Sequence, residues 1–248
     1  MNSAVEARVR EVVVARQYRG PPQSGNGGYV SGLLAHALGA DVTTAVLRAP
    51  IPLDEPLRLE SGEGEVQLLN AEGALIARAG AGDRAELPAP PSAPSYVDAE
   101  AAGRGFVGLD GGFHPICFTC ASGLAEGYGC RVFVGQLHGA ALGVVAGVWT
   151  PHANFAAEDG LTRTEVVWAA IDCPGSLCWV VQGAGGGLLG TMTGEILRRP
   201  AAGEACVVLA WPLERSGRKL ISGVALFTAD GELLARARQI WIGSAPAA

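Results

Sequence analysis

The sequence predicts an α+β protein built from two copies of one small fold, and three observations support that class. Residues 66–80 read VQLLNAEGALIARAG and residues 224–238 read VALFTADGELLARAR, with eight of fifteen positions identical at an offset of 158. A second match, at an offset of 150, pairs Leu47-Arg48-Ala49-Pro50 with Leu197-Arg198-Arg199-Pro200. In each copy an apolar helix pattern precedes a run of strand patterns, which is typical of helices packed on one face of an antiparallel sheet.

Composition narrows the functional class. The chain has 248 residues, of which 49% are apolar and 17% charged, so it can bury a sizeable core. Its net charge of −6 argues against nucleic-acid and membrane-surface partners, which are bound by basic patches. We expect no membrane span, because the most apolar stretch is interrupted by Asp172, Pro174 and several glycines. The start, MNSAVEARVREVV, lacks the apolar core of a signal peptide, and six cysteines interpreted as reduced thiols predict a cytoplasmic protein.

The first copy is predicted to begin with a strand at Val9–Tyr18, where β-branched residues are frequent. A glycine-rich loop then leads into Tyr29–Leu38, which is apolar nearly all round and predicts a buried helix that ends at Gly39. Glu72-Gly73 lies between two apolar runs and is a hairpin-turn signal. The strands of this copy are predicted at Val42–Ala49, at Pro56–Leu69 with a glycine break, and at Leu75–Ala79.

A proline-rich segment separates the copies. Leu87–Ser95 reads LPAPPSAPS and predicts an extended linker with few contacts, because proline fixes φ and removes backbone donors. We therefore divide the chain into a first domain at 1–86, a linker at 87–105 and a second domain at 106–248.

The second copy repeats the pattern. An Asp172-Cys173-Pro174-Gly175 turn precedes an apolar helix predicted at Ser176–Gln182, and the glycine run Gly183–Gly187 bends the chain where that helix leaves the sheet. Its strands are predicted at Arg131–Gln136, Ala141–Thr150, Gly190–Leu197, Cys206–Leu213, Leu220–Thr228 and Leu233–Ile242.

Together these motifs carry a family resemblance. A buried helix after Gly25-Asn26-Gly27-Gly28, then a strand ending in Leu-Arg-x-Pro and a long hairpin, resembles the hotdog fold, in which an antiparallel sheet wraps a central helix. Two tandem copies resemble the double-hotdog acyl-CoA thioesterases, in particular proteins of high-GC bacteria that carry a C-F-x-C motif, here Cys117–Cys120, and an Asp-Cys-Pro-Gly turn. The resemblance implies a hydrolase of acyl-CoA or another acyl thioester that needs no cofactor. It is compatible with a homodimer.

Asp172 is the leading catalytic candidate. One interpretation is structural, because an acidic residue two positions before a proline is a good helix N-cap. The other is catalytic: Trp168-Ala169-Ala170-Ile171 makes the surroundings apolar, and desolvation raises a carboxyl pKa towards that of a useful base. The resembled thioesterases use a carboxylate near the central helix to activate water or attack the thioester, and Asp172 takes that role by resemblance.

Asn26, Gly27 and Gly28 are expected to form the opposite half of the site. Glycines at a helix start leave backbone N–H groups open to a carbonyl oxygen, which is how an oxyanion hole is built. Asn26 would hold the water or the carbonyl, although many hotdog enzymes have His-Gly-Gly here, so the asparagine is a departure. The alternative is a loop whose glycines only allow a tight turn. The residues expected to contact substrate are Gln23, Tyr29, Cys173 and Gly175.

The cysteines suggest two further possibilities. His114, Cys117, Cys120 and Cys130 have zinc-like spacing, but the second pair is poorly formed and the segment is apolar. We therefore expect no metal, and a buried thiol pair instead. Cys173 at a helix start is a second candidate nucleophile, without a histidine close in sequence to serve as its base.

Two other functions stay open on the same fold. A hydratase or dehydratase would want an Asp with a nearby His on the helix-side loop, and no such Asp-x4-His spacing is present. A non-catalytic acyl-ligand-binding protein is consistent with the absence of the family's histidine from the first copy. The arginines available to anchor CoA phosphates are Arg48, Arg198, Arg199, Arg215 and Arg218.

Overall fold

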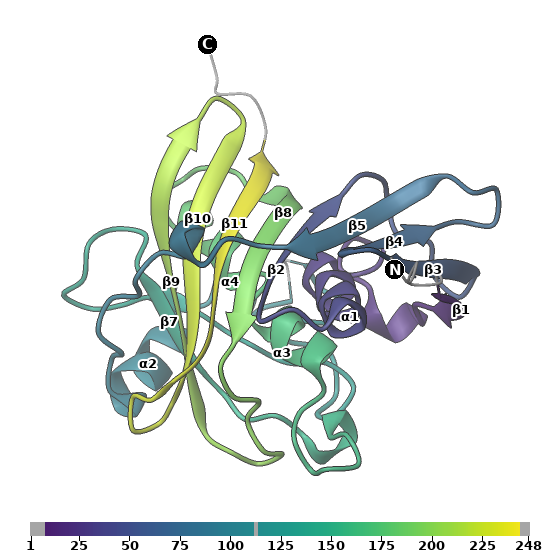
Figure 1. Cartoon of the computed structure of the whole chain (residues 1–248). Helices are drawn as coiled ribbons and strands as arrows, with labels where there is room; N and C mark the ends of the chain where they lie inside the picture. Colours follow the sequence, from purple (N-terminus) through teal and green to yellow (C-terminus); the bar gives the residue numbers. More distant parts are fainter. Residues whose placement is uncertain (1–7, 112–113, 244–248) are drawn as a thin grey trace.

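The computed structural model describes residues 8–111 and 114–243 and arranges their strands in one antiparallel sheet (Figure 1). The first seven residues, on which the predicted absence of a signal peptide partly rests, lie outside these ranges. The strand order is β1-β3-β4-β5-β2-β8-β11-β10-β9-β7-β6, which confirms the predicted α+β class. The strands are β1 (Arg8–Val13), β2 (Val42–Leu47), β3 (Pro56–Gly62), β4 (Glu65–Leu69), β5 (Leu75–Ala81), β6 (Gly135–Gln136), β7 (Val145–Trp149), β8 (Gly187–Ile196), β9 (Cys206–Ser216), β10 (Lys219–Thr228) and β11 (Leu233–Gly243).

Helices cover the sheet on both faces. The α-helices are α1 (Gly27–Leu38), α2 (Tyr96–Gly103), α3 (Thr164–Ala170) and α4 (Pro174–Val180), and short 3-10 turns lie at Arg16–Tyr18, Arg84–Glu86 and Ala153–Phe155. Helix α1 packs on β2, β4 and β5, and α4 packs on β7, β9 and β10. Within the described ranges, no helix has the length and hydropathy that crossing a bilayer requires.

The duplication read from the sequence appears in the hydrogen bonding of the two long hairpins. The β4–β5 register shifts between Leu68 and Leu69, and the β10–β11 register shifts at the matching place, between Leu226 and Phe227. In the first hairpin turn the Asn70 side chain accepts a hydrogen bond from the N–H four residues later, at 2.7 Å. Thr228, at the equivalent position, does the same at 3.0 Å. Each copy therefore keeps the same bulge and turn.

The two copies join through the β2–β8 pair. These strands are antiparallel neighbours from Val42 opposite Glu195 to Val46 opposite Thr191. Beside this pair the buried carboxylate of Glu195 accepts hydrogen bonds from Arg84 at 2.9 Å and Arg236 at 2.8 Å. Because Arg84 belongs to the first domain and Arg236 to the second, this ion cluster stabilises the junction.

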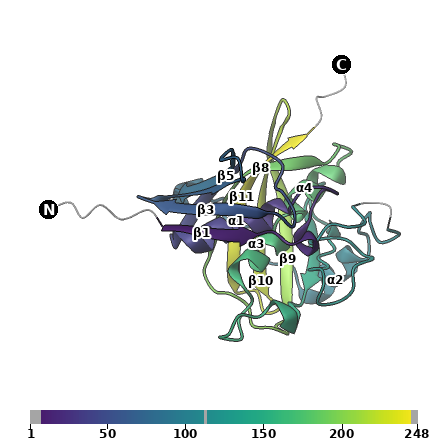
Figure 2. The same cartoon turned by 90° about the vertical axis from the view of Figure 1, so that its right-hand side faces the viewer.

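Helix α1 also meets the second copy, through two glycines. A Cβ atom on Gly28 would lie 2.5 Å from the Asp172 Cβ, and one on Gly32 would lie 2.5 Å from the Glu165 Cα. Only residues without a side chain allow α1 to approach α3 and the following turn so closely. Figure 2 shows α1 and α3 side by side. The start of α1 is thereby brought against Asp172.

Several predicted elements differ from the structure; the strand expected at Ala141–Thr150, for example, begins at Val145. The helix expected at Ser176–Gln182 forms as α4, but a separate helix, α3, precedes it, and Asp172 lies in the turn between them. The strand expected at Arg131–Gln136 is reduced to β6, because Arg131 has a positive φ of 59° and its guanidinium binds the carbonyls of Ser122 and Leu124. The strand expected at Val9–Tyr18 ends at Val13.

The predicted linker contains regular structure in its second half. Leu87–Ser95 has no helix or strand, but α2 follows immediately and packs against β7 and β9. Ala99 and Ala102 of α2 join a cluster with Val207 and Leu209, while Val208 faces the core on the opposite side of the sheet. This alternation is the two-residue period of a strand. Helix α2 therefore covers the sheet face opposite to α4.

Candidate active site

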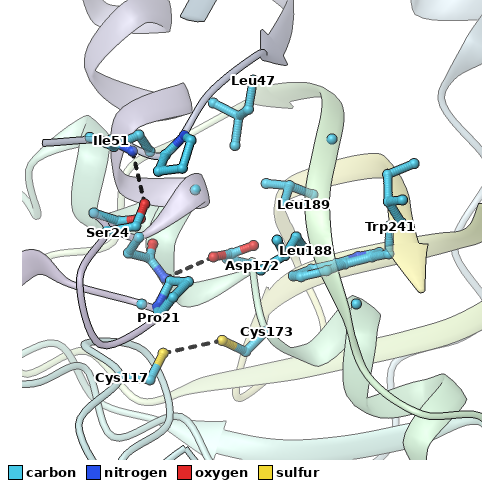
Figure 3. A pocket seen from close by; sticks show the side chains of 18 of the residues that line it. Pro21, Ser24, Leu47, Ile51, Cys117, Asp172, Cys173, Leu188, Leu189 and Trp241 are labelled. Atoms are coloured by element: carbon cyan, nitrogen blue, oxygen red, sulfur yellow. Dashed lines mark hydrogen bonds between the residues drawn. The ribbon is translucent and has the colours of Figure 1, made fainter. Parts of the chain in front are cut away.

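A cavity of about 760 Å³ lies between the two copies. The first copy contributes the loop from Gly20 to Gly27 and the segment from Leu47 to Ile51; the second contributes Asp172, Cys173, the start of β8 and the end of β11. Figure 3 shows the Asp172 carboxylate between the loop at Pro21 and the apolar side chains of Leu188, Leu189 and Trp241. A mostly apolar cavity with few polar groups is typical of a small-ligand site.

Asp172 is the only carboxylate among the described residues that line this cavity. Its side chain is 3% exposed. The Oδ2 atom accepts hydrogen bonds from the Asn26 Nδ2 at 2.8 Å and from the Gly28 N–H at 3.1 Å. Within the described ranges the Oδ1 atom has no partner. A buried acceptor without a partner is costly, so Oδ1 is the atom best placed to bind a water or a ligand donor.

Burial raises the pKa of Asp172 to about 7. Desolvation is the main cause, and the nearby Cys117 raises the pKa further, whereas the hydrogen bonds from Gly28 and Asn26 lower it. A carboxyl that titrates near neutrality exchanges protons readily at physiological pH, as a general base must. Asp172 does not cap its own helix: α4 has Cys173 at its N-cap position without a side-chain cap bond. Its carboxylate instead meets the first turn of α1.

Asn26 joins the α1 start to the second copy. Its Oδ1 accepts from the Tyr29 N–H at 2.8 Å and caps α1, which is the role expected of asparagine at that position. Its Nδ2 donates to Asp172 and, at 3.2 Å, to the Thr119 Oγ1. Thr119 in turn donates to the Ala169 carbonyl at 2.8 Å. Asn26 is therefore a positioning residue for the carboxylate, and its own polar atoms are all engaged.

The two glycines of the α1 start have different environments. The Gly28 N–H is used by Asp172, so it does not face an incoming substrate. The Gly27 N–H has no hydrogen-bond partner in the described part of the chain, and Gly27 lines the cavity. Of the two amides expected to bind an oxyanion, Gly27 is the one left available.

The other residues expected to contact substrate divide into two groups. Gln23 and Cys173 line the cavity. Tyr29 and Gly175 do not: the Tyr29 ring stacks on Tyr18 at 4.0 Å in the core, and Gly175 packs tightly against the Gln239 side chain. The structure thus brings Asp172, Asn26, Gly27, Gly28, Gln23 and Cys173 together and places Tyr29 and Gly175 behind them.

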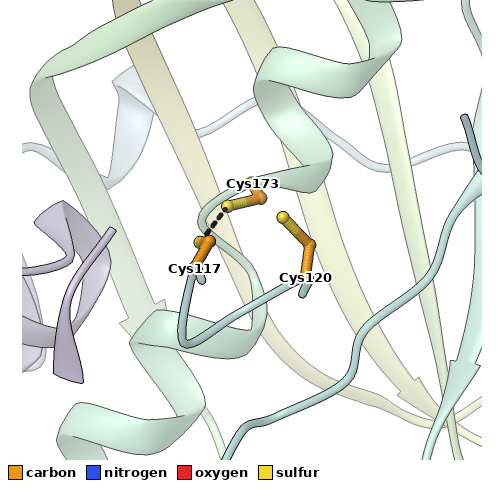
Figure 4. Close-up of side chains that lie close together, drawn as sticks. All are labelled: Cys117, Cys120 and Cys173. Carbon is orange, nitrogen blue, oxygen red and sulfur yellow. Dashed lines mark hydrogen bonds between the residues drawn. The ribbon is translucent and has the colours of Figure 1, made fainter. Parts of the chain in front are cut away.

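Three thiols lie close together in the second copy (Figure 4). The sulfur atoms of Cys117, Cys120 and Cys173 are all within 4.8 Å of one another, and Cys117 and Cys173 line the cavity. These sulfurs are the group in the described ranges that could share a soft metal ion. A structural zinc site needs a fourth ligand. Cys130 and His114, which completed the zinc-like spacing, are not part of the group.

Sequence reasoning did not assign roles to two other residues near the cavity. Thr119 was considered only as part of the C-F-x-C motif, yet it supports Asn26. His114 was considered only in the zinc-like spacing, yet it lines the cavity. Among the arginines, Arg48 lines the cavity, is exposed and has no ion-pair partner in the described ranges, whereas Arg198 and Arg199 pair with Glu204 and Asp159. The Leu-Arg-x-Pro repeat drew attention to Arg48 in the sequence. The structure adds that Arg198 and Arg199 form ion pairs, whereas Arg48 lines the cavity.

Comparison with known proteins establishes the fold. No protein-family model matches the chain, and no curated protein matches it in sequence. A candidate thioesterase from Novosphingobium aromaticivorans is similar over 98% of this chain and 97% of its own, with 17% identity and a TM-score of 0.61. The tesB protein of Mycobacterium avium subsp. paratuberculosis is similar over 98% and 95%, with 13% identity and a TM-score of 0.62. A hot dog fold protein of unknown function from Alicyclobacillus acidocaldarius is similar over 97% and 94%, with 14% identity and a TM-score of 0.63. The chain therefore has the hotdog fold in two copies.

Proposed function

We propose that this protein hydrolyses acyl thioesters, with acyl-CoA as the substrate class. The observation that carries the proposal is the Asp172 carboxylate, which is buried, titrates near neutrality and keeps Oδ1 without a partner beside an apolar cavity. Several proteins of similar fold are themselves described as candidate thioesterases, which agrees with this choice.

In the proposed reaction Asp172 acts as a general base. Its Oδ1 accepts a proton from a water molecule as the water oxygen attacks the thioester carbonyl carbon. Negative charge then develops on the carbonyl oxygen, and the Gly27 N–H at the start of α1 donates a hydrogen bond to it. When the carbon–sulfur bond breaks, the thiolate leaves and receives the proton from Asp172, while the acyl group departs as a carboxylic acid.

We assign the remaining parts of the substrate from the residues that line the cavity. Leu47, Leu188, Leu189 and Trp241 form an apolar wall that suits an acyl chain. Arg48 supplies an unpaired guanidinium at the rim, which suits a phosphate of CoA because guanidinium forks bind phosphate oxygens in pairs.

The test is a screen of acyl-CoAs of increasing chain length with the wild type, Asp172→Asn and Asp41→Asn as an exposed matched control. Released CoA is measured by chromatography, so that the protein's own thiols do not contribute. We expect Asp172→Asn to lower turnover by about 10²-fold or more, the usual contribution of an acid–base group, and Asp41→Asn to leave it unchanged. Equal turnover in the wild type and Asp172→Asn would exclude Asp172 as the base. No CoA release from any chain length would favour a non-catalytic acyl binder.

A further inference from the structure

The proposed hydrolysis leaves a second chemical group in the cavity unused. Cys117 and Cys173 both line the cavity, and their sulfur atoms are 3.5 Å apart. Cys120 lies behind them, 1% exposed, with its sulfur within 4.8 Å of both. The three come from separate parts of the second copy, the Cys117–Cys120 turn and the turn before α4. Because 56 positions separate Cys117 from Cys173, the sequence alone does not show that these thiols are neighbours.

The surroundings of Cys117 favour its thiolate. Hydrogen bonds from the thiols of Cys120 and Cys173, and from the backbone N–H groups of Cys120 and Thr119, lower the pKa of Cys117 well below its usual range. The hydrogen bond to Cys117, together with burial, raises the pKa of Cys120 and of Cys173. Cys117-Phe118-Thr119-Cys120 is also a C-x-x-C motif, the spacing in which the first cysteine is commonly the reactive one.

Access to Cys117 is restricted to the cavity. Its side chain is 2% exposed, so a folded protein partner cannot reach the sulfur, whereas a small molecule in a space of about 760 Å³ can. The other three cysteines, Cys130, Cys178 and Cys206, are buried and do not line the cavity. For Cys178 and Cys206 burial raises the pKa, to about 12 for Cys206. Among the six cysteines, Cys117 is therefore the one that both lines the cavity and has a lowered pKa.

We propose that Cys117 and Cys173 form a thiol–disulfide exchange centre for low-molecular-weight disulfides that enter the cavity. The Cys117 thiolate attacks one sulfur of a disulfide R–S–S–R; that bond breaks, a mixed disulfide forms on Cys117, and R–S⁻ leaves and takes a proton from solvent. Cys173 then loses its proton to solvent and attacks the Cys117 sulfur. A Cys117–Cys173 disulfide forms and a second R–SH leaves. Two protein thiols are oxidised and one small disulfide is reduced to two thiols.

The experiment uses the reduced full-length protein and 2-hydroxyethyl disulfide, followed by mass spectrometry of the intact protein and of its peptides under non-reducing conditions. In the wild type we expect a Cys117–Cys173 disulfide and no stable adduct. In Cys173→Ser the second step is blocked, so the mercaptoethanol adduct should accumulate on Cys117. In Cys117→Ser neither product should form. Cys206→Ser, which removes a buried thiol away from the cavity, should behave as the wild type does.

Several outcomes would overturn the proposal. One is an adduct on Cys173 in Cys117→Ser that forms as fast as the one on Cys117. Another is accumulation of the adduct in Cys120→Ser but not in Cys173→Ser, which would make Cys120 the second thiol. Stoichiometric zinc in the purified protein, with thiols that react only after chelation, would replace exchange by metal binding. Melting temperatures of all variants separate loss of reaction from loss of fold, and Cys173→Ser keeps Cys117 testable even where Cys117→Ser is unstable.

Discussion

The Asp172 carboxylate lies 2.8 Å from the side-chain nitrogen of Asn26, although 146 positions of the chain separate the two residues. One residue precedes the first helix of the first copy and the other precedes the last helix of the second. The contact requires the close approach of α1 to α3 at Gly28 and Gly32. A single hydrogen bond thus links the capping of α1, the packing of the two copies and the protonation of the proposed base.

The rate of thioester hydrolysis should rise with pH around neutrality. Asp172 must be ionised to accept a proton, and burial raises its pKa to about 7. We therefore expect kcat/KM to increase from acidic pH to a plateau above a midpoint near 7, measured with a short-chain acyl-CoA. A flat profile, or one with a midpoint in the ordinary carboxylate range, would contradict a buried base.

Asp172→Asn should make the protein more stable at alkaline pH. The pKa of Asp172 is higher in the folded protein than in the unfolded chain, so its contribution to the free energy of unfolding is complete below about pH 4 and is lost as pH rises towards 7. An asparagine keeps an acceptor for Asn26 and Gly28 without the buried charge. Denaturant unfolding at pH 8 should show a gain on the order of a few kcal/mol, which disappears near pH 4. A variant less stable than the wild type at pH 8 would mean that Asp172 is mainly structural.

Asn26→Ala should move the pH–rate midpoint upward. The hydrogen bond from Asn26 lowers the pKa of Asp172, so its removal raises that pKa. Loss of the α1 cap should also reduce stability by about 1 kcal/mol. Asn70→Ala, which removes a hairpin-turn hydrogen bond instead, serves as the matched control and should leave the midpoint unchanged. Equal pH–rate midpoints in the wild type and Asn26→Ala would show that Asn26 does not influence the protonation of Asp172.

Gly32→Ala should destabilise the protein despite the better helix propensity of alanine. The added Cβ would lie 2.5 Å from the Glu165 Cα and would force α1 away from α3. Overpacking of this kind costs about 1–3 kcal/mol in unfolding free energy. Gly62→Ala, where no atom lies within 4 Å of the new methyl group, is the control. If both variants unfold at the same denaturant concentration, the helices do not meet as closely as described.

Arg48→Gln should weaken binding of CoA thioesters specifically. We expect a higher KM for acyl-CoA and little change in kcat, and no change in either for the same acyl group on N-acetylcysteamine, which has no phosphate. Arg215→Gln, at an exposed position of β9 outside the cavity lining, provides the control. A similar rise in KM with both thioesters would mean that Arg48 supports the local structure of the cavity and does not bind the CoA phosphates.

The fold was predictable because its evidence is local and repeated. The Leu-Ala-Gly pattern shared by 66–80 and 224–238 encodes the same bulge and turn twice, and an apolar segment such as Tyr29–Leu38 predicts a buried helix wherever it lies. The segment at Arg131–Gln136 shows where prediction from local sequence patterns fails. Its β-branched residues favour a strand, but Val132 donates its N–H to the Thr119 carbonyl in a distant turn, and such non-local bonds leave no periodic pattern.

Sequence reasoning named part of the candidate site: it included Asp172 and Asn26, but it also included Tyr29 and Gly175, which do not line the cavity. Asp172 and the Asn26-Gly27-Gly28 segment are marked by helix-start chemistry, and duplication suggests that the two starts face each other. The Gly28 N–H donates a hydrogen bond to the Asp172 carboxylate because α1 lies close to the turn that holds Asp172. Residue types alone do not give the distance between two helices, so this contact could not be predicted from the sequence. The approach of Cys173 to Cys117 has the same origin, since 56 positions separate them.

The β2–β8 pair has a consequence for how the molecule could be divided. Either copy alone would expose the hydrogen-bonding edge of its own strand, β2 or β8, together with the glycine surface of α1 or its counterpart on α3. Chain scission within Leu87–Ser95, which has no helix or strand, leaves those complementary surfaces intact. Two fragments made this way carry matching halves of one cavity, the amides on one and the carboxylate and thiols on the other. If the proposed function holds, hydrolysis should therefore require association of the two fragments through the β2–β8 pair.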